Sequence, residues 1–189
     1  FTMAKRWYVI HTYSGYENKV KEDLAHRIET MGVANSVVDI QIPTEEVMQM
    51  LCMELERIAP EIIASVVRID HEGRLRPLAG PSLEPAYIAL MDGVSIGPAC
   101  GSCGTAAWSG KPVISSNIAT DPNWEGIAEH ALRHGLAACW STPVEASDGR
   151  ILGTFACYYR KAQEPDPRHL RLIQTCVHLC AVALERDLS

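Results

Sequence analysis

The sequence of 189 residues predicts an α+β fold, an antiparallel sheet flanked by helices. Two segments, residues 137–144 and 151–159, are rich in small, β-branched and aromatic residues, which is typical of strands. Ser147-Asp148-Gly149 joins them, and its glycine can adopt the positive φ that a tight hairpin needs. Both segments are apolar on both faces for most of their length. We therefore predict that they are central strands, covered on each side.

Composition limits the classes of protein to which the chain can belong. Its length suits one domain of ordinary size with a small addition, and 47% apolar residues suffice for a core. The net charge of −6 argues against nucleic acid as a partner. The sequence shows neither an apolar run of membrane-spanning length nor a signal-peptide pattern. We expect a soluble, cytoplasmic protein without a membrane partner.

The first 48 residues predict a β-α-β extension of this fold. Residues 5–13 alternate and are rich in Trp, Tyr, Val and Ile, which indicates a strand. Residues 16–31 carry an apolar residue at every fourth position, which indicates an amphipathic helix. Residues 37–42 form a second short strand before Pro43.

The rest of the chain supplies the elements around the central strands. Residues 92–123 are glycine-rich with little periodicity, so we expect an irregular backbone around a pocket, broken by a short strand. Asp121 and Pro122 are typical of a helix start, as N-cap and first residue. The expected helices are 44–59, 82–90, 121–134 and 167–188, and the expected strands are 62–69, 74–79 and 113–115.

Two of these helices predict a homodimer. The segments 44–59 and 167–188 carry apolar residues over a wider surface than packing on one side requires. An apolar helix surface of this width calls for a partner rather than solvent. We expect the two helices to form a dimer bundle. The alternative is that both lie deep within one monomer.

The N-terminal residues MAKRWYVIHTYSGYENKV, followed after the helix by IPTEEVM, resemble the start of the transcription factor NusG. The resemblance ends near Val47 or Met48, and it implies the beginning of a domain that binds RNA polymerase. A strand, a helix and a strand cannot cover both faces of a sheet. We interpret residues 1–48 as an incomplete NusG-like fragment in a chimera, and we do not expect RNA polymerase as a partner. Trp7, Tyr8 and Tyr13 are interpreted as packing residues.

The motifs GSCGTAA, DPNW, GLAACWS and LGTFA resemble the GAF domains of bacterial signalling proteins, those found beside cyclic-di-GMP enzymes and histidine kinases. The resemblance runs from residue 49 to about residue 186, and we assign residues 49–189 to this domain. It implies five or six antiparallel strands, with the terminal helices on one face and a small-molecule pocket closed by loops and short helices on the other. It also implies a sensory or regulatory function in which ligand binding is signalled through the terminal helices at a dimer interface. The alternative is a dimerisation module without a ligand.

Five residues are candidates for binding the unknown small-molecule ligand: Cys103, Thr105, Trp124, Cys139 and Ser141. The segment from Gly101 to Thr105 could expose backbone N–H groups and a hydroxyl to an anionic or polar ligand atom. Trp124 could form a stacking wall or could cap the core. Cys139 and Ser141 could point inward from their strand.

The cysteines raise one enzymatic alternative. Cys52, Cys176 and Cys180 fit buried helix positions, where cysteine behaves as a small hydrophobe. GSCGTAA resembles GVCGTA of the free methionine-R-sulfoxide reductases, which implies Cys103 as a reactive thiol. In that family a second reactive cysteine precedes the equivalent of segment 137–144, whereas Cys139 lies inside it. We therefore favour a protein that is not an enzyme.

The cysteines and histidines of this region also raise the alternative of a metal or cofactor site. Cys100 and Cys103, with His130 and His134 one helical turn apart, form a possible zinc set. Both histidines suit a solvated helix face equally well, and no motif around them indicates haem. We expect neither a metal nor a cofactor.

Overall fold

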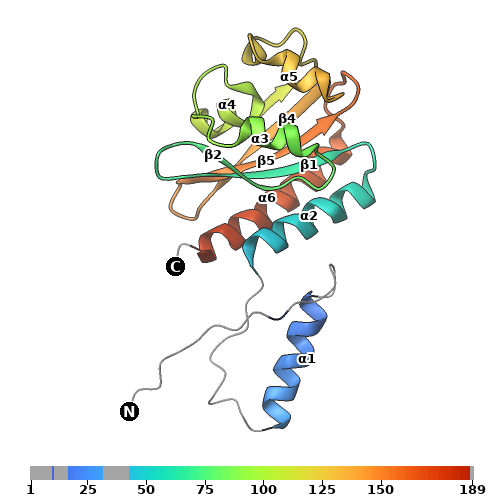
Figure 1. The fold of residues 1–189 in the computed structure, drawn as a ribbon, viewed down its shortest axis with the longest axis vertical. Helices are drawn as coiled ribbons and strands as arrows, with labels where there is room; N and C mark the ends of the chain where they lie inside the picture. The colour runs from blue at the N-terminus through green and yellow to red at the C-terminus, as the bar shows by residue number, and fades with distance from the viewer. Residues whose placement is uncertain (1–9, 11–16, 32–42, 188–189) are drawn as a thin grey trace. The chain divides into compact units, whose positions relative to one another are not determined.

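The computed structural model describes residue 10 and residues 17–31 and 43–187, and the chain divides into two units, Phe1–Pro43 and Thr44–Ser189 (Figure 1). In the first unit, helix α1 (Glu17–Thr30) confirms the amphipathic helix. The predicted strands 5–13 and 37–42 lie outside the described residues, Ile10 excepted.

The second unit is built on a five-stranded antiparallel sheet with the strand order β2-β1-β5-β4-β3. Its strands are β1 (Ile63–Ile69), β2 (Leu75–Ala79), β3 (Val113–Ser115), β4 (Ala138–Glu145) and β5 (Ile151–Tyr159). The predicted central position of the hairpin is confirmed, since β5 is the middle strand and β4 lies beside it. The strands expected over 62–69, 74–79 and 113–115 are also present.

Successive side chains of β5 enter two different cores, because side chains of a strand alternate between its faces. Phe155, Cys157 and Tyr159 belong to one buried cluster, and Ala156 and Tyr158 belong to the other. Both clusters are closed to solvent, which explains why the strand is apolar on both faces.

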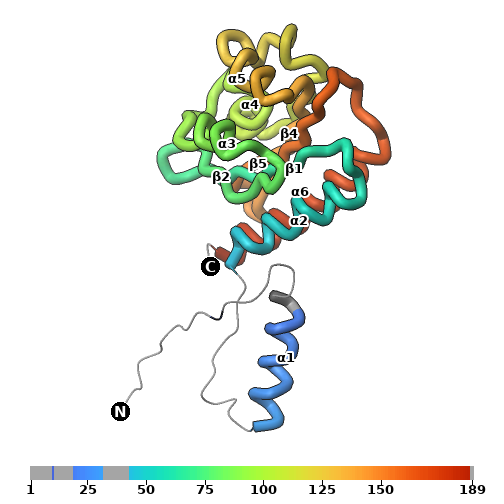
Figure 2. The backbone as a smooth tube through the Cα atoms, turned by 45° about the vertical axis from the view of Figure 1, so that its right-hand side comes forward, coloured from blue at the N-terminus to red at the C-terminus, as the bar shows by residue number. Residues whose placement is uncertain are grey.

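Helices α2 (Thr44–Ile58) and α6 (Pro167–Asp187) cover one face of the sheet and lie side by side in both views (Figures 1 and 2). Met48, Cys52 and Leu55 of α2 are buried with Ile173 and Cys180 of α6 against the strands. Within residues 17–31 and 43–187, no helix is long and apolar enough to cross a membrane.

Short helices cover the opposite face: α3 (Pro85–Met91), α4 (Gly101–Ser109), a 3-10 turn (Pro122–Trp124) and α5 (Ala128–Arg133) (Figure 1). Helix α4 corrects the expectation of irregular backbone over 92–123. Its sequence GSCGTAAWS has no apolar period because residues Gly101–Ala107 are buried on all sides. A Cβ at Gly104 would lie 2.7 Å from the Cys100 Cβ, so only glycine allows this turn.

The prediction of a single helix over 121–134 is also wrong. The Asp121 side chain caps the start as predicted, accepting from the Asn123 backbone N–H at 2.8 Å. The helix stops after Trp124, because Gly126 has a φ of +79° that no α-helix accommodates, and α5 begins afresh at Ala128.

Gly153→Ala should destabilise the protein by about 3 kcal/mol or more, because the new Cβ would overlap backbone atoms. It would lie 2.1 Å from the Val67 carbonyl oxygen and 2.9 Å from the Arg68 Cα on neighbouring β1. Urea unfolding followed by circular dichroism measures the loss. Gly126→Ala is the control, since nothing lies within 4 Å of its Cβ, and it should cost only about 1 kcal/mol for its positive φ. Equal losses would contradict this account of β5.

Candidate functional site

Polar side chains from three neighbouring strands gather on the face that α4 covers. Ser65 of β1 and Ser141 of β4 are the two cross-strand partners of Ala156 in β5. Thr154 lies two positions before Ala156 and therefore faces the same side. The hydroxyl oxygens of all three residues are fully buried and have no hydrogen-bond partner. An unpaired buried hydroxyl costs about 1–3 kcal/mol, so this arrangement calls for a physical explanation.

Two sulfur-containing side chains, Cys103 and Met91, are buried in the core on the same face. Cys103 of α4 is buried, and its Sγ lies 3.7 Å from the Tyr158 hydroxyl. That hydroxyl donates to the Met91 Sδ at 3.4 Å and accepts from the Tyr87 hydroxyl at 3.3 Å. Helices α3 and α4 thus meet strand β5 through a chain of polar contacts inside an apolar core.

The pKa of the Cys103 thiol is lowered to about 7, which makes it the more acidic of two neighbouring thiols. Its side-chain hydrogen bond with Cys139 is the largest cause, and the hydroxyls of Ser141, Tyr158 and Thr154 add to it against the opposing effect of burial. Burial and the adjacent Cys103 raise the pKa of Cys139 well above its ordinary value. A Cys103 thiolate would thus offer an acceptor to the hydroxyls of Ser141 and Thr154.

Trp124 holds the start of α4 to the edge strand β3. Its Nε1 donates to the hydroxyl oxygens of Ser102 and Ser115 at 3.1 and 3.0 Å. Its ring packs on Gly101, where an added Cβ would lie 3.5 Å away. The side chain is buried in the same core as Cys103. In this position Trp124 caps the core, and its hydrogen-bonding group is fully used.

Thr105 is also engaged locally, because its hydroxyl accepts from the Cys100 backbone N–H at 3.1 Å. The segment from Gly101 to Thr105 is a buried helical turn rather than an open loop. Of the five predicted residues, the structure brings together Cys103, Cys139 and Ser141, while Trp124 lies beside Ser102 and Thr105 beside Cys100. The sequence interpretation missed the residues that complete the cluster: Ser65, Tyr87, Met91, Thr154 and Tyr158.

The possible zinc set is not assembled. The His134 Nδ1 lies 2.6 Å from a carboxylate oxygen of Glu84, while Cys103 is buried in the core beside Cys139. Across the part of the chain that the structure describes, no group of three or more His, Cys, Asp or Glu side chains is placed to hold a metal ion.

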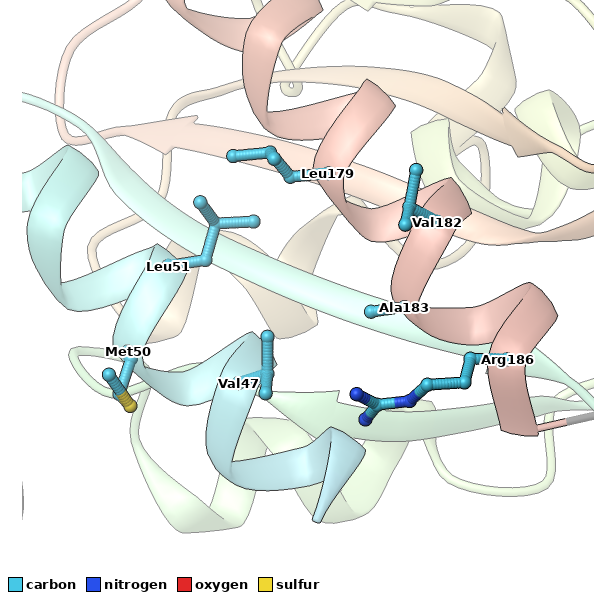
Figure 3. Close-up of a pocket in the computed structure, with 7 residues that line it drawn as sticks. All are labelled: Val47, Met50, Leu51, Leu179, Val182, Ala183 and Arg186. Carbon is cyan, nitrogen blue, oxygen red and sulfur yellow. The ribbon is translucent and has the colours of Figure 1, made fainter. Parts of the chain in front are cut away.

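The opposite face of the sheet carries an apolar groove between α2 and α6 (Figure 3). Its volume is about 420 Å³. The lining residues are Val47, Met50, Leu51, Leu179, Val182, Ala183 and Arg186. Leu179 and Val182 are about half exposed, at 48% and 57%. Apolar side chains that remain open on two adjacent helices mark a surface suited to a partner.

Family comparisons agree with this architecture. The family model described as "GAF domain" matches residues 41–185, so the chain belongs to the GAF domain family. The "Methyl sulfide methyltransferase-associated sensor" of Methanosarcina acetivorans is 36% identical over 142 residues, which is 75% of this chain and 14% of that protein. A solved type II free methionine-R-sulfoxide reductase from Thermoplasma acidophilum superposes with a TM-score of 0.60 at 16% identity, covering 76% of this chain and 93% of that one.

The N-terminal region is NusG-like, as its motifs predict. The family model "Transcription termination factor nusG" matches residues 5–70. NusG of Bacillus subtilis is 54% identical over 44 residues, which is 23% of this chain and 25% of that protein. The family-model match runs past Val47 and Met48 through α2 and β1, which belong to the second unit. The chain spans a small share of the length of both curated relatives.

Trp124→Phe should lower the free energy of unfolding by about 1–2 kcal/mol, because it removes the donor shared by Ser102 and Ser115 while keeping most of the ring. Chemical denaturation measures the change. Trp108→Phe is the matched control, since Trp108 is 56% exposed on α4 and should change stability by less than about 0.5 kcal/mol. An unaltered stability for Trp124→Phe would exclude its role in holding α4.

Proposed function

We propose that this chain is a sensory GAF domain that binds a small molecule between α4 and the sheet and signals through α2 and α6 at a homodimer interface. The observation that carries the proposal is the set of three buried hydroxyls without partners, on Ser65, Ser141 and Thr154. A bound molecule with donors and acceptors would satisfy them, and their burial favours a small one. The name "sensor" of the Methanosarcina relative supports the same class of function.

The groove between α2 and α6 supports a second copy of the chain as the partner on the other face. Two adjacent helices with open apolar side chains can pair with the same two helices of a second copy to give a four-helix bundle. Such an interface is self-complementary, since Val182 and Leu179 of one copy meet apolar residues of α2 in the other. The groove would then be filled by side chains.

Two consecutive residues of β5 connect the faces. Tyr158 contacts Cys103 on the α4 face, while the Tyr159 hydroxyl on the other face lies 3.1 Å from His169 Nδ1 at the start of α6. The His169 Nε2 in turn lies 2.8 Å from a carboxylate oxygen of Glu61, which precedes β1. A shift of β5 on ligand binding would therefore move a buried polar contact of α6, which is the kind of discrete change that biases a helix interface.

A free methionine-R-sulfoxide reductase is the second candidate, favoured by the acidic Cys103 thiol beside Cys139. The fold similarity to the Thermoplasma enzyme is compatible with it. Such an enzyme turns over repeatedly with a dithiol reductant. Thioredoxin-dependent consumption of free methionine sulfoxide would establish this activity, and its absence from the reduced, folded protein would exclude it.

Native mass spectrometry of the purified protein tests the sensory proposal. We expect a dimer in which each copy carries a non-covalent small molecule. Val182→Glu should give a monomer that retains the molecule, because a buried carboxylate in the groove opposes pairing while the α4 face is untouched. Met53→Glu is the control, since Met53 is 47% exposed on α2 outside the groove, and it should stay dimeric.

Three results would count against the proposal. A wild-type monomer at micromolar concentration contradicts the dimer interface. A dimer of bare protein mass supports a dimerisation module without a ligand. Equal disruption by Val182→Glu and Met53→Glu places the interface away from the groove.

A further inference from the structure

We propose that Glu61, His169 and Tyr159 form a proton-operated latch on helix α6, in which proton uptake by His169 breaks its contact with strand β5 and leaves its contact with Glu61. This inference goes beyond the proposed sensory function, because the latch needs neither a small molecule nor a second copy of the chain.

The latch joins three segments at the start of α6. His169 lies in the first turn of the helix and is buried, with 4% of its surface exposed. Its Nδ1 lies 3.1 Å from the Tyr159 hydroxyl at the end of β5, and its Nε2 lies 2.8 Å from a carboxylate oxygen of Glu61. The rings of Tyr159 and His169 are stacked, with an angle of 13° between their planes. One imidazole therefore holds the start of α6 through both of its nitrogens.

The two contacts define which nitrogen carries the proton in the neutral imidazole. The pKa of the Glu61 carboxyl is lowered, first by a hydrogen bond with its own backbone and then, against the effect of burial, by His169 and Arg168. An ionised carboxylate only accepts hydrogen bonds, so the His169 Nε2 must be the donor. Nδ1 is then an acceptor, and the Tyr159 hydroxyl donates to it. Burial raises the pKa of Tyr159, so this hydroxyl keeps its proton.

A proton on Nδ1 is incompatible with this arrangement. With hydrogens on both nitrogens, His169 can only donate, and the Tyr159 hydroxyl proton loses its acceptor. In the part of the chain that the structure describes, that hydroxyl has no other hydrogen-bond partner. The Trp140 ring lies on Tyr159 with centroids 4.3 Å apart, but its Nε1 is itself a donor, buried without a partner. The Glu61 contact, in contrast, becomes an ion pair.

Imidazole is the group whose charge ordinarily changes between about pH 5 and 8, and the groups around it do not change theirs. The Arg168 side chain donates to Asp166 at 2.9 Å and lowers the pKa of that carboxyl to about 2. Burial raises the pKa of Cys139 and of Cys157 well above the ordinary value. The charged and titratable groups that act on the latch are thus constant over this range: Glu61, Tyr159, Asp166, Arg168, Cys139 and Cys157.

Solvent reaches one side of the latch. The side chains of Glu61 and Arg168 are 51% and 77% exposed. The contact lies in a terminal turn, and helix ends open more readily than helix centres. A proton can therefore reach the imidazole without any opening of the core.

NMR of the full chain, with isotope-labelled histidine and tyrosine, tests the latch between about pH 8 and 5. At the upper end we expect His169 to carry its proton on Nε2. On acidification Nδ1 should gain a proton, and the ring signals of Tyr159 should move with the same midpoint. His169→Gln should remove the response of Tyr159. The matched control is His178→Gln, an exposed histidine of the same helix, which should leave both titrations unchanged.

Two further variants should move the midpoint in opposite directions. Tyr159→Phe removes the donor that favours the neutral imidazole, so His169 should take up its proton at a pH higher by roughly half to one unit. Glu61→Gln removes the charge that favours the imidazolium while keeping an acceptor oxygen. His169 should then take up its proton at a pH lower by roughly the same amount. Side chains that serve only to pack would not give these opposite shifts.

The latch is excluded if the Tyr159 signals do not follow His169, if Nδ1 carries the proton at the upper end of the range, or if His169 does not titrate within it. Midpoints that move in the same direction in the two variants also exclude it. A bare monomer that shows the coupled titration defeats the sensory proposal alone. A dimer that carries its small molecule but lacks the coupled titration defeats the latch alone.

Discussion

The pairing of β5 on both edges is the constraint on which the rest of the structure depends. With β1 on one side and β4 on the other, β5 exposes no backbone edge, and each of its side chains must enter a core above or below the sheet. Gly153 shows how tight this arrangement is, since even a methyl group there would overlap the backbone of β1. Two covering layers are therefore obligatory, and the helices at the two ends of the GAF unit and the short helices between β2 and β4 supply them.

The two layers that cover the sheet differ in chemistry. Under α2 and α6 the buried side chains are mostly apolar, and their four cysteines have raised pKa values. Under α4 the core contains hydroxyls, two interacting thiols and a thioether. Buried hydroxyls are costly inside a protein when they have no hydrogen-bond partner. Strand β5 contributes side chains to both cores, so a displacement of β5 at one face would also displace its side chains at the other.

Much of the fold could be predicted from the residues alone. Strands β1, β4 and β5 follow from apolar, β-branched runs bounded by turns, and α2 and α6 from their apolar periodicity. Helix α4 could not be found this way, because a helix of small residues buried on every side has no polar face to produce a period. The break between the 3-10 turn and α5 depends on the positive φ of Gly126. A glycine allows this backbone conformation, but its presence in the sequence does not predict it.

Only part of the candidate site could be predicted, because the sequence does not reveal the register in which the strands pair. Cys103, Cys139 and Ser141 stand out in their motifs, and they do come together. Ser65, Thr154 and Tyr158 join them only because β1, β5 and β4 pair in the observed register, which the sequence does not reveal. The side-chain chemistry of Thr105 and Trp124 makes them candidates in the sequence, but local hydrogen bonds to Cys100 and Ser102 engage them in the structure. The ligand role of all five residues stays a prediction.

The central claim is that β5 couples the α4 face to the terminal helices, and amide hydrogen exchange in Tyr158→Phe tests it most directly. This change removes one hydroxyl on the α4 face and touches no residue of α6. The account predicts altered exchange in the first turns of α6 around His169, with α1 unaffected as an internal reference. Exchange in α6 identical to that of the unaltered protein would contradict the claim.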